Sequence, residues 1–191
     1  DKGWEDLRDR VGVNGTTGQA QFPYLGANVT GSTLAPSTVV ERDGVKIGYV
    51  GAVTETTPTL VSPSGVAGLN FSAPVAAADA EANHLKESGE ADVVVALLHG
   101  GLDASAYQPT MENPGLHLAQ VPGIDAMVMG HQHGVFPDRG ANPGYKQPGV
   151  DNAAGTVNGV PAVMPSSSST GWPSGVPVRP MVPLGKPSDD R

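Results

Sequence analysis

Two near-continuous runs of apolar residues organise the chain, and each is followed by glycine and histidine. The first run spans Asp92–Leu98 and leads into His99, and the second spans Ile124–Met129 and leads into Gly130 and His131. Apolar runs of this length bounded by glycine predict strands that are buried on both faces of a sheet. A helical pattern precedes each run, and this alternation predicts an α/β fold with largely parallel strands and right-handed crossovers.

Shorter patterns predict the remaining elements. Asp43-Gly44 is the strongest hairpin signal in the chain. Pro74 suits the first turn of a helix that runs to about Ser88 before Gly89, with Ser72 as a plausible cap. The other expected elements are a helix at Trp4–Val11, a strand at Phe22–Val29, hairpin strands at Thr38–Arg42 and Val45–Val53, a surface loop at Glu55–Gly68, a helix near Glu112–Gln120, irregular chain at Asp138–Gly155 and a strand at Thr156–Met164 with a turn or bulge at Asn158-Gly159.

The domain organisation follows from where this periodicity stops. Residues 1–165 carry the predicted elements and form one expected domain, large enough for a hydrophobic core. Residues 166–191 are rich in proline and serine and have little periodicity, which predicts an irregular tail. The chain begins with Asp1 rather than Met, which is typical of a fragment or a processed product.

Composition narrows the classes of function. Charged residues make up 16% of the 191 residues and the formal net charge is −8, without a cluster of lysine and arginine. This argues against binding to a nucleic-acid polymer but not against single nucleotides. The chain has no cysteine, which excludes a disulfide framework and a thiolate metal site. The sequence shows no membrane-spanning stretch and no signal peptide, and the oligomeric state is not predicted.

The histidines after the two apolar runs are candidate metal ligands. His131 and His133 are two residues apart, so their imidazoles project to the same side of an extended backbone. Imidazole binds zinc and similar divalent ions, and Gly130 removes a side chain that would crowd the rings. The alternative is a surface loop that holds two histidines by chance. His99 favours the metal site, because two parallel strands would deliver three imidazoles to one edge of a sheet.

Three segments together carry a family pattern: LLHGG at Leu97–Gly101, MENPGLHLAQVPGIDAMVMGHQHGVFP at Met111–Pro137 and VNGVPAVMP at Val157–Pro165. They resemble the metallophosphoesterases of the 5′-nucleotidase and 2′,3′-cyclic-nucleotide phosphodiesterase/3′-nucleotidase family. FPYLGANV and the segment from Ile47 to Phe71 are closer to secreted bacterial 5′-nucleotidases. The resemblance implies part of a four-layer αββα sandwich, the C-terminal half of a catalytic domain, and a periplasmic or extracellular location.

The resemblance also implies a set of ligands for two divalent metal ions, among which Zn, Mn, Mg and Ca are not distinguished. By resemblance, His99 and His131 would bind one metal and His133 the other, while Gly130 would support the site. Asn113 would either support the site or cap the following helix. The family's Asp-x-His element, bridging aspartate and Asn-His pair do not occur in residues 1–90, and no residue matches its catalytic histidine. Three neutral imidazoles supply no charge compensation, so this chain alone is expected to bind metal weakly.

Three interpretations follow for the function. The first is a metal-dependent phosphoesterase that hydrolyses nucleotide substrates, with the cyclic phosphodiesterase/3′-nucleotidase branch slightly favoured over the 5′-nucleotidase branch. The second is a non-catalytic metal-binding or interaction fragment that has lost the remaining ligands. The third is an ordinary α/β domain whose histidines have no functional role. His84 and His117 are not expected to bind metal in any of these interpretations, because they lie within predicted helices and not beside glycine at strand ends.

Overall fold

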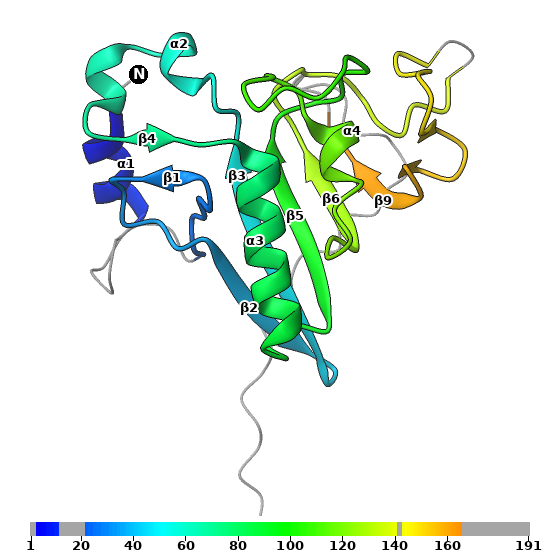
Figure 1. The fold of residues 1–191 in the computed structure, drawn as a ribbon, viewed down its shortest axis with the longest axis horizontal. Helices are drawn as coiled ribbons and strands as arrows, with labels where there is room; N and C mark the ends of the chain where they lie inside the picture. Colours follow the sequence, from blue (N-terminus) through cyan, green and yellow to red (C-terminus); the bar gives the residue numbers. More distant parts are fainter. Residues whose placement is uncertain (1–2, 12–21, 141–142, 166–191) are drawn as a thin grey trace, which may run out of the picture.

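The computed structural model describes residues 3–11, 22–140 and 143–165. Within this part of the chain the main sheet has seven strands in the order β2-β3-β5-β6-β9-β8-β7, and β1 and β4 form a separate pair (Figure 1). The strands span Val29–Thr30 (β1), Ser37–Arg42 (β2), Val45–Val53 (β3), Asn70–Phe71 (β4), Val93–His99 (β5), Ala126–Met129 (β6), Val150–Asp151 (β7), Thr156–Val157 (β8) and Val160–Val163 (β9). The central strands β3, β5, β6 and β9 are parallel, which confirms the predicted α/β class.

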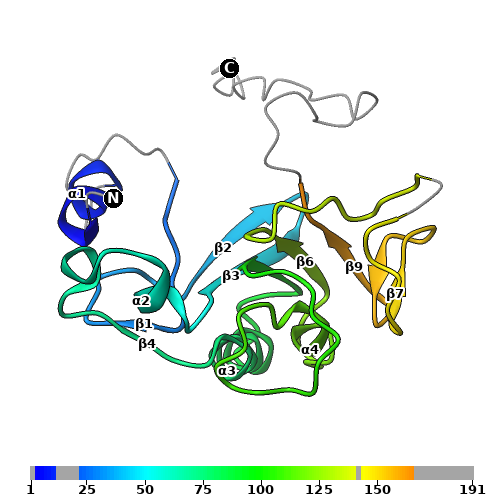
Figure 2. The same ribbon diagram turned by 90° about the horizontal axis from the view of Figure 1, so that it is seen from above.

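One face of the main sheet is covered by helices. Helices α3 (Pro74–Glu87) and α4 (Gly115–Leu118) both lie on this face (Figure 2). Side chains alternate along a strand, so every second residue of β5 points toward these helices. Val94, Ala96 and Leu98 are buried there, together with Ala78, Ala82 and Leu85 of α3. The core is therefore the layer between α3, α4 and the sheet.

The opposite face of the sheet is only partly covered. Val95 and Leu97 of β5 are half-buried, while Val128 of β6 is 39% exposed and Val163 of β9 is 48% exposed. The expectation that the central strands are buried on both faces is thus wrong for the described residues, because their helices pack on one side. A continuous apolar run shows that both faces of a strand carry apolar residues. It does not show that both faces are buried.

The strongest local signals correspond to the observed elements. Asp43 and Gly44 adopt φ values of 53° and 81°, the left-handed conformation that a tight turn with two positive φ angles requires. Their hairpin pairs Arg42 with Val45 and continues to Ser37 opposite Val50. Pro74 begins α3 as expected, but the cap is Ala73 rather than Ser72, and no side chain caps the helix. The amino-terminal helix α1 spans Gly3–Val11, close to its predicted bounds.

Other predicted elements are wrong or much shorter than expected. Phe22–Val29 is irregular apart from an isolated bridge at Leu25 and the start of β1. The helix expected near Glu112–Gln120 is reduced to the four residues of α4. The expected loop Glu55–Gly68 contains two short helical turns, α2 at Thr57–Leu60 and a 3₁₀ turn, η1, at Pro63–Val66.

The C-terminal part of the described chain also differs in detail. The strand expected over Thr156–Met164 is a hairpin, in which β8 and β9 pair around Asn158-Gly159 with φ values of 47° and 82°. Strand β7 lies inside the segment expected to be irregular. The predicted tail, residues 166–191, lies outside the described residues. Among the helices that the structure does describe, none is long and apolar enough to cross a membrane.

Asn28 replaces the missing strand pairing of its segment with side-chain hydrogen bonds. The residue is 1% exposed. Its Nδ2 donates to the carbonyl oxygens of Val53 and Ser72, each at 2.7 Å, and its Oδ1 accepts from the Val53 amide at 3.0 Å. We call this set the Asn28 clamp. It ties the irregular segment to the end of β3 and to the segment before α3.

Candidate metal centre

The candidate site lies at the carboxyl edge of the parallel strands. His99 is the last residue of β5 and pairs in register with Val53, the last residue of β3. It follows the alternation of Val95 and Leu97, so its ring projects on the sheet face that the helices leave uncovered. The amide of Thr54 donates to the His99 carbonyl oxygen at 3.1 Å, which fixes the backbone beyond the strand end.

The other two histidines lie in the turn that follows β6. His131 and His133 both adopt positive φ angles, 73° and 58°. Left-handed conformations are costly for a residue with a side chain, although histidine tolerates them better than most. The assumption that His131 and His133 lie in extended backbone is therefore wrong. The turn holds them in strained backbone that the surrounding contacts must stabilise.

Two of the three predicted histidine rings, those of His99 and His131, lie side by side. The ring centroids of His99 and His131 are 5.0 Å apart, with the planes inclined by 61°. His99 lies close enough to both His131 and His133 to be affected by their charge. Partial burial is the main cause that lowers the pKa of His99 below its ordinary value, and repulsion from His131 and His133 lowers it further. This environment favours the neutral imidazole, which is the form that binds metal ions.

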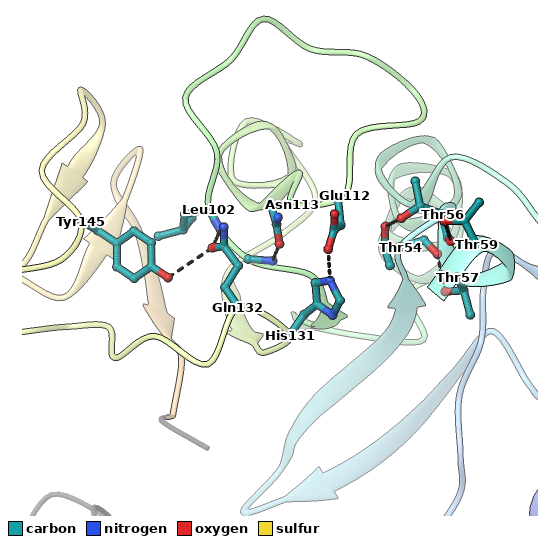
Figure 3. Close-up of polar contacts among 11 residues, drawn as sticks. Thr54, Thr56, Thr57, Thr59, Leu102, Glu112, Asn113, His131, Gln132 and Tyr145 are labelled. Carbon is teal, nitrogen blue, oxygen red and sulfur yellow. Dashed lines mark hydrogen bonds and ion pairs between the residues drawn. The ribbon is translucent and has the colours of Figure 1, made fainter. Parts of the chain in front are cut away.

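Hydrogen bonds hold the two histidine-bearing loops against each other (Figure 3). The side-chain oxygen of Gln132 accepts from the Leu102 amide at 2.7 Å and from the Tyr145 hydroxyl at 3.2 Å. Asn113 Oδ1 accepts from the Gly101 amide at 2.9 Å. We call the bonds from Gln132 and Asn113 to the backbone of residues 101 and 102 the rim clamp. Asn113 thus supports the loop after His99 without contacting an imidazole, which is consistent with its predicted supporting role.

Comparison with known proteins places this arrangement in a family. No family model matches the chain. It is 35% identical over 164 residues to a 2′,3′-cyclic-nucleotide 2′-phosphodiesterase/3′-nucleotidase of Salmonella typhimurium, an alignment that covers 76% of this chain and 24% of that protein. It is 32% identical over 142 residues to a 5′-nucleotidase of Diplobatis ommata, covering 70% of this chain and 22% of that one.

A solved structure agrees in fold as well as in sequence. The calcineurin-like phosphoesterase YfkN from Bacillus subtilis matches with a TM-score of 0.67 and 34% identity, covering 78% of this chain and 47% of that one. The chain belongs to the nucleotidase and cyclic phosphodiesterase family of calcineurin-like phosphoesterases. It spans 24% of the length of the Salmonella relative and therefore corresponds to part of such a protein. The resemblance stated from the sequence is confirmed.

Two acidic residues at this edge have contacts or surroundings that the sequence did not predict. Glu112 Oε1 lies 2.5 Å from His131 Nε2. Glu112 belongs with Asn113 to an element that matches the family, but nothing in the sequence indicated its contact with a residue 19 positions later. Glu55 lies two residues after β3, and its Oε2 is buried without a hydrogen-bond partner among the described residues. A buried, unpartnered carboxylate oxygen is unusual, and no sequence signal distinguished it.

Gly130 lies between the two histidine loops. Apart from its two chain neighbours, a Cβ atom added at this position would meet His99 Nδ1 at 3.9 Å, which is ordinary van der Waals distance. The backbone amide of Gly130 donates to the Gly100 carbonyl oxygen at 3.3 Å and so joins the two histidine loops.

The remaining histidines lie elsewhere. His84 is on α3, 3.8 Å from Glu90, and both side chains are largely exposed. His117 is on α4, where its Nε2 contacts the Ser105 carbonyl oxygen at 3.0 Å and its ring lies beside Tyr107. Across the described residues, no group of three or more histidine, cysteine, aspartate or glutamate side chains is arranged to hold a metal ion. The rings of His99 and His131 are adjacent, but the chain as described does not complete a ligand set.

Proposed function

We propose that this chain forms part of a divalent-metal site for the hydrolysis of nucleotide phosphoesters. The observation that carries the proposal is the adjacency of the His99 and His131 rings, 5.0 Å apart, at the ends of two parallel strands. In this proposal His99 and His131 bind one divalent ion and His133 binds a second. The neutral state of His99 that its surroundings favour suits a metal ligand.

Bound divalent ions would supply two kinds of chemistry: a lower pKa for an attacking water and neutralisation of charge on the phosphoryl oxygens. The residues of this chain would contribute by orientation. The rim clamp fixes the loops that carry the histidines, and the left-handed backbone at His131 and His133 directs both side chains from one short turn. We assign no proton-transfer role to any residue of this chain.

We propose 2′,3′-cyclic nucleotides and 3′-nucleotides as the favoured substrates. The name of the Salmonella relative states this activity, and the alignment with it is longer than the one with the 5′-nucleotidase of Diplobatis ommata, at 164 against 142 residues. A periplasmic or extracellular location is proposed on the family resemblance. Fractionation of cells that express the full-length protein would check the location.

A substrate panel on the full-length protein tests the function. With Mn²⁺ or Zn²⁺ supplied, we expect hydrolysis of 2′,3′-cyclic AMP and 3′-AMP to exceed that of 5′-AMP. His99→Ala should reduce turnover at least about 100-fold, because a ligand at the reacting centre is lost. His84→Ala is the matched control, since His84 lies exposed on α3, and should leave turnover unchanged. Equal turnover by both variants would refute the assignment of the site.

The alternative is a metal-binding protein without catalytic activity. The observation in its favour is that residues 1–90 lack the family's Asp-x-His element, bridging aspartate and Asn-His pair, while the His99 and His131 rings are adjacent. Zinc titration by calorimetry separates the two functions. Binding at one site together with no turnover of any substrate in the panel would support the non-catalytic function. Binding that depends on His99, His131 and His133 and accompanies turnover would support hydrolysis.

A further inference from the structure

The contact between Glu112 and His131 links the loop before α4 to the histidine turn after β6. Glu112 Oε1 approaches Nε2 of the imidazole, and Figure 3 shows the carboxylate aimed at the ring. The His131 side chain is 18% exposed, whereas that of Glu112 is 47% exposed. Glu112 and Asn113 are neighbours in sequence, yet Asn113 bonds to the Gly101 backbone and Glu112 to an imidazole.

The chemistry of the two groups fixes which ring nitrogen carries the proton. An ionised carboxylate can only accept hydrogen bonds. Nε2 of His131 must therefore carry a hydrogen when it faces Glu112. In the neutral ring, Nδ1 is then the nitrogen with the free lone pair. A metal ion needs that lone pair, so the carboxylate determines both the tautomer and the nitrogen that can bind.

We propose that Glu112 is a positioning residue that holds the Nε2–H of His131 and thereby presents Nδ1 to a divalent cation. This inference rests on the proposed function, because it assumes that His131 is a metal ligand. A histidine ligand commonly donates its second ring N–H to a carboxylate, which orients the ring and makes it a better ligand. Glu112 also places a negative charge beside His131, whereas neutral imidazoles supply no negative charge to balance a metal ion.

Stability alone does not explain the pair. A salt bridge or hydrogen bond with a carboxylate that is nearly half exposed contributes little to folding, because water competes for the same groups. The contact of His84, on α3, with Glu90 gives a comparison: the atoms are 3.8 Å apart and both side chains are more exposed. Of these two carboxylates, that of Glu112 is the one whose imidazole partner also neighbours a second imidazole, that of His99.

Zinc titration of the full-length protein and four variants (Glu112→Gln, Glu90→Gln, His131→Ala and the double variant of His131 and Glu112) tests the role of Glu112 in binding. Glu112→Gln can offer either an oxygen or an NH₂ group to Nε2 and so no longer selects a tautomer. We expect it to weaken zinc binding about 10-fold, the lower end for loss of such a partner. Glu90→Gln, the matched control, should bind as the parent does. In a His131→Ala background, Glu112→Gln should have no further effect, because the positioned ring is gone.

Nuclear magnetic resonance of the imidazole nitrogens tests the tautomer directly. In the metal-free protein, at a pH at which the spectra show a neutral ring, His131 should carry its hydrogen on Nε2, and Glu112→Gln should admit the other tautomer. In the zinc-loaded protein, Nδ1 of His131 should be the coordinated nitrogen. Coordination through Nε2, or unchanged zinc affinity in Glu112→Gln, would overturn the inference.

The two measurements also separate this inference from the proposed function. If the parent protein binds no zinc, the proposed function fails, whereas the metal-free spectra still decide whether Glu112 selects the tautomer. If the parent binds zinc through His131 but Glu112→Gln binds equally well, the proposed function stands and the inference about Glu112 is wrong.

Discussion

The Asn28 clamp and the rim clamp solve a similar problem in different surroundings. Each uses amide side chains to satisfy backbone groups of irregular chain beside a strand end. Asn28 is almost completely buried and uses both of its side-chain atoms. Gln132 is exposed and Asn113 is half-buried. Water competes for the rim side chains more readily than for Asn28, so we expect the Asn28 clamp to contribute more to the stability of the fold than the rim clamp does.

The two regions also differ in backbone conformation. Asn28 does not have a positive φ angle, and its side chain is hydrogen-bonded to Val53 and Ser72. The rim carries two histidines with positive φ, a backbone conformation that costs free energy in a residue with a side chain. Strain that is tolerated at a partly exposed turn indicates that the position of these side chains matters more than the stability of the turn. The predictions below test this contrast.

The largest expected effect is that of Asn28→Ala. It removes three hydrogen bonds and leaves the amide of Val53 and the carbonyl groups of Val53 and Ser72 without a partner. We expect a loss of about 3 kcal/mol in the free energy of unfolding, measured with urea. Asn83→Ala, which replaces an exposed asparagine on α3, should change it by less than about 0.5 kcal/mol. A loss below 1 kcal/mol for Asn28→Ala would mean that water reaches this clamp.

The second effect couples Gln132 to Gly101. Gln132→Ala leaves the amide of buried Leu102 without its partner and should cost about 1 kcal/mol. A Cβ on Gly101 would lie 2.0 Å from Gln132 Oε1, so Gly101→Ala should displace the same side chain and cost a similar amount. The double variant should be less destabilised than the sum by at least about 0.5 kcal/mol. Additive losses in urea unfolding would show that the two positions act separately.

Local sequence signals were sufficient for the elements that build the sheet. The apolar run before His99, the Asp43-Gly44 turn and the proline that starts α3 each act within a few residues, and the structure confirms all three. The convergence of His99 and His131 was also predictable, because parallel strands bring their carboxyl ends to one edge.

Elements that depend on distant partners could not be predicted in the same way. Phe22–Val29 has the composition of a strand, but Asn28 bonds to groups 25 and 44 residues away and takes the place of strand pairing. The contact between Glu112 and His131 joins two loops whose paths only the assembled sheet defines.

The third prediction concerns the cost of the left-handed backbone. His133→Gly should raise the free energy of unfolding by about 0.5–1 kcal/mol, because glycine adopts positive φ without steric strain. His133→Ala, the matched control, keeps the strain and should give no gain. Both variants should lose the zinc affinity attributed to His133. A loss of stability in the glycine variant would show that the exposed ring makes contacts that outweigh the strain.

The smallest expected effect is a pH dependence that originates at His99. Burial, followed by the charges of His131 and His133, lowers the pKa of His99 in the folded chain below its ordinary value of about 6.5. Between these two values the unfolded chain binds more protons than the folded chain, so stability falls as the pH falls through that window. Above about pH 6.5 this contribution to stability is fully present. Below the folded pKa its loss is complete.

His99→Gln removes the titrating group and should therefore flatten this part of the stability curve. The test compares urea midpoints of parent and variant across the window in the presence of a chelator, so that metal release does not contribute. His84→Gln is the control, because His84 is exposed on α3. Its curve should follow that of the parent. Parallel curves for the parent and His99→Gln would mean that the rim does not discriminate against the charged imidazole. The electrostatic difference between the rim and the rest of the surface would then be too small to favour a neutral metal ligand.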